Sequence, residues 1–69
     1  MIAQTDKEVI EELARRELCQ PSRLTVNEQH CFRLEKAALL RTVYESGSRF
    51  GVFRPTAAGL AMIAKAAVP

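Results

Sequence analysis

The sequence predicts a small α+β domain in which two helices are followed by a short β-hairpin and a C-terminal helix. Two capping patterns in the first half mark helix starts, and two runs rich in β-branched and aromatic residues flank a Ser-Gly-Ser turn. The chain has 69 residues, so we expect residues 1–69 to form a single domain. That length leaves no room for a separate substrate domain, and we expect a binding protein and not an enzyme.

The first helix is predicted to begin after Thr5, because Thr5-Asp6-Lys7-Glu8 has the form of a capping box. An apolar stripe at helical spacing follows, made by Val9, Ile10, Leu13 and Ala14. Glu11 precedes Arg15, and Glu12 precedes Arg16, by four residues, which predicts two ion pairs on the exposed face. The helix should run to about Cys19, since Pro21 cannot continue it.

The second helix is predicted to start at Val26, because Thr25-Val26-Asn27-Glu28 repeats the capping-box pattern. The following thirteen or so residues contain neither glycine nor proline. Two apolar sets lie on different faces of this helix: Cys31, Leu34 and Ala38 on one, Phe32 and Leu39 on the other. The helix therefore has more than one apolar contact to satisfy.

A β-hairpin is predicted from Arg41–Glu45 and Arg49–Arg54, joined by Ser46-Gly47-Ser48, in which Gly47 permits a positive φ. Thr56 can cap a last helix from Ala57 to about Ala67. That helix is apolar nearly all round, so we expect a second subunit to cover it in a homodimer. The expected dimer interface consists of Phe32, Leu39, Leu60, Met62 and Ile63.

Two motifs in the C-terminal half carry a family resemblance. Leu39-Leu40-Arg41-Thr42 looks like the end of a recognition helix that runs into a strand. Phe53-Arg54-Pro55-Thr56-Ala57-Ala58-Gly59 resembles the aromatic-x-Leu-Thr-x-x-Gly signature that closes the wing in MarR-like and PadR-like regulators, with proline in place of leucine. The chain thus resembles the winged helix-turn-helix DNA-binding family. Only about 25 residues precede the presumed recognition helix, so the resemblance implies a truncated, winged-helix-like domain with a short wing.

Gly59 stands inside the predicted last helix, where glycine costs roughly 1 kcal/mol relative to alanine. The resemblance implies a reason, because the start of this helix would lie close against the hairpin or the preceding helix. A β-carbon at position 59 would then collide with its neighbours.

A polar stripe on the second helix is the candidate DNA-binding surface. Gln29, Arg33 and Lys36 are spaced i, i+4, i+7 and share one face. Arginine pairs bidentately with guanine and glutamine with adenine, whereas lysine mainly holds phosphate. Asn27 near the helix start is also of base-reading type, and Arg49 near the wing tip can touch a phosphate. An ordinary solvated helix face is the alternative interpretation.

The charge is distributed unevenly along the chain. Residues 1–20 carry three basic and five acidic side chains, whereas residues 21–69 carry seven basic and three acidic ones. The basic surface therefore belongs to the second part, although the net charge of the whole chain is only +2.

Two functions fit these observations. The first is a small sequence-specific DNA-binding transcriptional regulator of prokaryotic or phage type, with double-stranded DNA as its partner. The alternative is a small phage-type inhibitor or adaptor that uses the same scaffold to bind a host protein, such as a transcription factor or a CRISPR complex. The basic second part favours the former, and small size and surplus apolar surface favour the latter.

No cofactor or metal is expected. Cys19, His30 and Cys31 are the soft ligands, and they lack the paired four-ligand spacing of a structural zinc site. Two cysteines do not make a disulfide framework, and no cationic segment with an apolar signal core stands at the N-terminus. The expected location is therefore the cytoplasm, without a membrane span.

Overall fold

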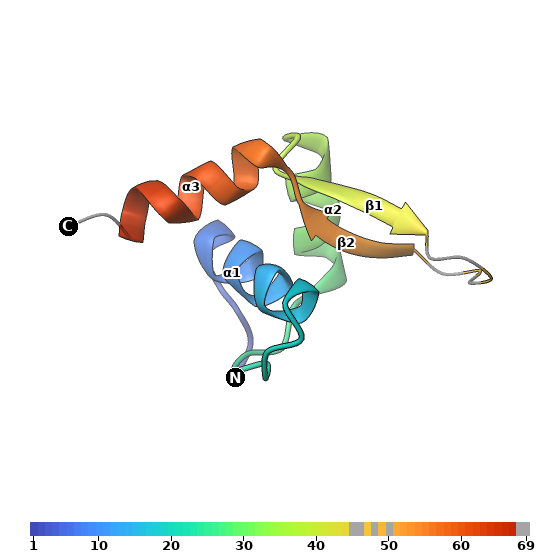
Figure 1. The fold of residues 1–69 in the computed structure, drawn as a ribbon, viewed down its shortest axis with the longest axis horizontal. Coiled ribbons are helices and arrows are strands. Elements are labelled where there is room, and N and C mark those ends of the chain that lie inside the picture. The colour runs from blue at the N-terminus through green and yellow to red at the C-terminus, as the bar shows by residue number, and fades with distance from the viewer. Residues whose placement is uncertain (45–46, 48, 50, 68–69) are drawn as a thin grey trace.

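The computed structural model describes residues 1–44, 47, 49 and 51–67 of the chain (Figure 1). Helices α1 (Asp6–Glu17) and α2 (Glu28–Lys36) precede the antiparallel strands β1 (Leu40–Tyr44) and β2 (Gly51–Pro55), and α3 (Ala57–Ala67) follows. This order confirms the predicted α+β class and is consistent with a winged-helix-like arrangement. In Figure 1, α3 extends over α1 and away from the hairpin.

The hairpin connection is described only at two positions. Gly47 has a φ of 80°, as expected for the turn. Glu45, Ser46, Ser48 and Phe50, which belong to the predicted strands and turn, lie outside the described residues.

The capping box at the start of α1 is confirmed. The Glu8 N–H donates to Thr5 Oγ1 at 3.1 Å, and the Thr5 N–H donates to Glu8 Oε1 at 3.2 Å. The backbone N–H groups of Gln4 and Thr5 favour the ionised carboxylate and lower the pKa of Glu8 below its usual value.

Both α1 and α2 end earlier than the sequence predicts. α1 stops at Glu17, and the next turn places Cys19 at a φ of 57°. α2 stops at Lys36, with Ala38 at a φ of 63°. At each end an N–H bonds five residues back, from Gln20 to the Arg15 carbonyl and from Leu39 to the Leu34 carbonyl. This is the left-handed helix ending that glycine usually provides.

The predicted start of α2 is also wrong by two residues. Its N-cap is Asn27, whose side-chain oxygen accepts the Gln29 N–H at 2.8 Å. Thr25 does not cap the helix because its backbone pairs with the N-terminal segment. Its N–H donates to the Met1 carbonyl at 2.9 Å, and its carbonyl accepts the Ala3 N–H at 2.8 Å.

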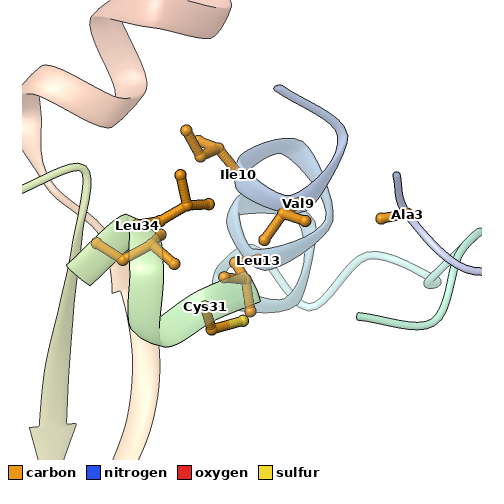
Figure 2. Packing of buried hydrophobic residues seen from close by; sticks show 7 residues of the cluster. Ala3, Val9, Ile10, Leu13, Cys31 and Leu34 are labelled. Carbon is orange, nitrogen blue, oxygen red and sulfur yellow. The ribbon is translucent and has the colours of Figure 1, made fainter. Parts of the chain in front are cut away.

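The core lies between α1, α2 and the base of the hairpin. Figure 2 shows side chains of α1 turned toward Leu34 and Cys31 of α2. The buried apolar residues are Ala3, Val9, Ile10, Leu13, Cys31, Leu34 and Leu40. Half-buried apolar side chains surround them, namely Leu24, Val26, Leu39, Phe53, Met62 and Ile63. All five elements thus contribute to a single core.

Glu12 is the one charged residue buried among the described residues, with 3% of its surface exposed. Its two carboxylate oxygens accept the Arg23 N–H at 3.2 and 3.1 Å and fasten the α1–α2 connector to α1. The expected ion pair between Glu12 and Arg16 is therefore wrong, and Glu11 pairs with Lys7, not with Arg15. Arg16 instead donates from Nε to Ser22 Oγ.

The start of α3 is pressed against the end of α2. The Thr56 N–H donates to the Leu39 carbonyl at 3.1 Å, and Thr56 Oγ1 donates to the Ala38 carbonyl at 2.7 Å. The same hydroxyl accepts the Gly59 N–H at 3.1 Å, which confirms Thr56 as the cap of α3. A β-carbon on Gly59 would lie far inside contact distance of the Leu39 carbonyl oxygen. The close packing expected at Gly59 is therefore confirmed.

We expect Gly59→Ala to lower the free energy of unfolding by about 1–3 kcal/mol, because the backbone of Leu39 must move to admit the methyl group. Urea unfolding measures this change. Ala61→Gly, at an exposed position of the same helix, is the matched control and should cost about 1 kcal/mol through helix propensity alone. Stabilisation by Gly59→Ala would contradict the close packing.

Candidate nucleic-acid interface

The predicted polar stripe lies on the face of α2 that points away from the core. Cys31 and Leu34 are buried, whereas Gln29, Arg33 and Lys36 are all exposed. With a rotation of 100° per residue, the mean direction of the three exposed side chains is almost opposite to that of the two buried ones. The structure thus brings the three predicted residues together on one surface.

The charges of this stripe are not neutralised within the described part of the chain. Neither Arg33 nor Lys36 forms an ion pair there. Both lie in the last turn of α2, where the helix dipole favours positive charge. Arg33 and Lys36, which have no ion-pair partner among the described residues, thus lie exposed on the same face as the Gln29 amide.

Asn27 stands at the start of the same helix, but its side chain has a structural task. The amide oxygen that a base-reading asparagine would use accepts the Gln29 N–H. Asn27 therefore fixes the first turn and with it the position of Gln29.

A second face of α2 is fastened to the hairpin. Thr42 Oγ1 donates a hydrogen bond to the carboxylate of Glu35. The rings of Phe32 and Phe53 meet edge to face, with centroids 5.3 Å apart and planes at 82°. These two contacts set the angle between α2 and the hairpin.

Arg49 is exposed and borders a hollow between α2 and the hairpin, together with Phe32 and Tyr44. The wing arginine is thus on the α2 side of the hairpin, as the DNA-binding hypothesis requires. Glu28 and Glu35 border the same hollow, so acidic groups lie on this side of α2.

A contact that no sequence pattern indicates anchors α2 to α1. His30 Nε2 lies 2.6 Å from Asp6 Oδ1, at the first turn of α1. The two residues are 24 positions apart, so no local spacing could have revealed the pair. The contact holds the first half of α2 against the N-terminus of α1.

Both cysteines are free, with Cys19 exposed and Cys31 buried. Burial raises the pKa of the Cys31 thiol, while nearby Arg16 lowers it and Glu28 raises it. Among the described residues, no group of three or more His, Cys, Asp or Glu side chains is placed to hold a metal ion.

The residues predicted for a dimer interface divide into two sets. Leu39, Met62 and Ile63 are half-buried and pack against the core of their own chain. Phe32 and Leu60 remain exposed, at 48% and 43% of their surfaces. On α3 the exposed apolar face comprises Ala57, Ala58, Leu60, Ala61 and Ala64.

Comparison of the chain with models of protein families, with characterised proteins and with solved structures finds no significant match. Across residues 1–44 and 51–67, no helix has both the length and the apolar character needed to span a bilayer.

Proposed function

We propose that this protein is a small sequence-specific DNA-binding transcriptional regulator of prokaryotic or phage type, which places α2 in the major groove. The observation that carries the proposal is the exposed stripe of Gln29, Arg33 and Lys36 opposite the core. A cytoplasmic location goes with this function.

The dimensions of α2 suit this role. Nine residues make a helix about 14 Å long, and the diameter of an α-helix with its side chains, about 10–12 Å, matches a major groove about 12 Å wide. In that position Arg33 forks onto the O6 and N7 atoms of a guanine, and Gln29 pairs with the N6 and N7 atoms of an adenine. Lys36 binds phosphate, and Arg49 contacts the backbone from the hairpin.

The contacts of α2 within the domain support accurate docking. The Asp6–His30 pair holds one side of the helix, and the Glu35–Thr42 bond holds another. Side chains on the exposed face are therefore presented at a fixed angle before DNA arrives, and less orientational freedom is lost on binding.

We expect Arg33→Ala to weaken binding to the preferred duplex by about 1–3 kcal/mol and to relax discrimination at one base pair. Lys36→Ala should weaken binding to all sequences alike and reduce the salt dependence, since it removes a phosphate contact. Selection from random duplexes, followed by mobility shifts at several salt concentrations, measures both effects. Arg15→Ala, on α1, is the control. Equal losses for all three variants, or no DNA binding by the wild type, would contradict the proposal.

We also propose that the regulator is a homodimer joined through α3. The exposed apolar face of this helix, centred on Leu60, supports the pairing. A dimer would present two copies of α2 to successive turns of a duplex, as palindromic sites require. It would also bury apolar surface that so small a core leaves in water.

Leu60→Glu is expected to convert the dimer into a folded monomer, because Leu60 is exposed in the subunit and its replacement disturbs no core contact. Sedimentation equilibrium at micromolar concentration gives the mass, and circular dichroism checks the fold. Tyr44→Glu, also at an exposed apolar side chain but on the hairpin, should remain dimeric. A monomeric wild type under these conditions would refute the dimer.

The alternative proposal is a small inhibitor or adaptor that binds a host protein. It is supported by the exposed rings of Phe32 and Tyr44, 48% and 67% exposed, beside the acidic groups of the hairpin hollow. Salt separates the two functions, since phosphate recognition weakens steeply as salt rises and an apolar protein interface does not.

A further inference from the structure

One edge of the hairpin has no strand beside it in the described part of the chain. β2 pairs with β1 in the register Thr42–Phe53 and Tyr44–Gly51. The bond from the Thr56 N–H to the Leu39 carbonyl fixes which pairs share hydrogen bonds. Hydrogen-bonded and non-hydrogen-bonded pairs alternate along an antiparallel ladder, so the Thr42–Phe53 and Tyr44–Gly51 pairs are not hydrogen-bonded. The N–H and C=O groups of Gly51 and Phe53 therefore point away from β1.

These four backbone groups have no partner among the described residues. Gly51 and Phe53 are two residues apart, so their outward groups repeat at about 7 Å, the spacing at which an added strand forms its bonds. Pro55 stands at the next outward position and has no N–H to offer. The edge of β2 therefore offers two residues, Gly51 and Phe53, that can both donate to and accept from an added strand, and Pro55 marks the end of this stretch.

A groove of about 370 Å³ runs beside this edge, between β2 and the two helices. Leu13 and Cys31 are buried in its floor, and Val26 is half-buried there. Three charged residues border the groove, namely Arg16 of α1, Arg54 of β2 and Glu28 of α2. A free strand edge thus adjoins an apolar floor with one cation on the α1 side.

We propose that this groove binds an extended peptide segment of a partner protein, which adds to β2 as a third strand. Its backbone pairs with Gly51 and Phe53, and one apolar side chain rests on the floor formed by Leu13, Val26 and Cys31. A carboxylate of the peptide faces Arg16, whose described hydrogen bond is to the neutral hydroxyl of Ser22. Glu28 repels an acidic residue on the α2 side, which gives the peptide a preferred direction.

A peptide fits this groove better than a compact ligand because the open donors and acceptors alternate along a line. The groove and the stripe of Gln29, Arg33 and Lys36 lie on opposite faces of α2. The groove adjoins the hollow beside Arg49, with which it shares Gly51 and Phe53. The inference does not rest on the proposed function and stands or fails without it.

Short random peptides displayed on phage, selected against the full chain, supply the probe for the test. We expect the enriched sequences to alternate apolar and other residues and to share an acidic position. When one such synthetic peptide is added to 15N-labelled protein, the amides of Gly51 and Phe53 should shift and become protected from hydrogen exchange. Failure to enrich any peptide, or shifts that leave these amides unchanged, would overturn the proposal.

Two variants test the two kinds of contact. Arg16→Glu should weaken peptide binding by about tenfold, while Arg15→Glu, the neighbouring arginine, should change it by less than about twofold. Chemical synthesis can replace the Phe53 amide with an ester, which removes the outward N–H and keeps the bond from β1 to the Val52 carbonyl, in weakened form because an ester carbonyl is a poorer acceptor. We expect a loss of roughly tenfold, and little change for an ester at Lys7 in the first turn of α1. Equal effects of variant and control in either pair would overturn the proposal.

A second copy of the chain is the competing occupant. If β2 paired with β2 of another copy, protection at Gly51 and Phe53 would appear without peptide and increase with protein concentration. That outcome would also overturn the peptide proposal.

Discussion

The carbonyl groups of Ala38 and Leu39 hold the start of α3 against the end of α2 through Thr56. Ala38 adopts a left-handed conformation, which ends α2 and turns the chain so that Leu40 enters the core as the first residue of β1. The hydroxyl of Thr56 then bonds the Ala38 carbonyl and caps α3 at the same time. Because Gly59 has no side chain, α3 can approach Leu39 closely and lie across α1. This junction positions β1, β2 and α3 relative to α2.

Helix α2 contacts the rest of the domain on three of its sides, and its fourth side is exposed. The core holds Cys31 and Leu34, the start of α1 holds His30, and the hairpin holds Glu35 and Phe32. The remaining face has a polar and positively charged surface for which the described part of the domain provides no partner. A rigid helix with one free basic face is suited to a grooved polyanion, and this arrangement is the physical basis of the proposed DNA recognition.

Much of this fold could be predicted because its signals are local. The Thr5 capping box, the cap at Thr56 and the polar stripe on α2 each follow from residues within a few positions of one another. The ends of α1 and α2 could not be predicted, because Cys19 and Ala38 occupy left-handed positions where glycine is usual. Thr25 was the expected cap of α2, but its backbone pairs with the N-terminal segment, and Asn27 is the cap. The burial of Glu12 and the pairing of Asp6 with His30 depend on contacts between residues distant in sequence, which hydrophobic periodicity does not reveal.

Amide chemical-shift mapping can show whether the free face of α2 contacts DNA. A pool of random-sequence duplexes is titrated into the 15N-labelled chain at low salt, so that phosphate contacts are detected without knowledge of the preferred site. We predict that the largest shifts fall on Gln29, Arg33 and Lys36, with smaller ones at Arg49, and that they fade as salt is raised. Shifts confined to α3 or to the groove beside β2, or no shifts at all, would contradict DNA recognition by α2.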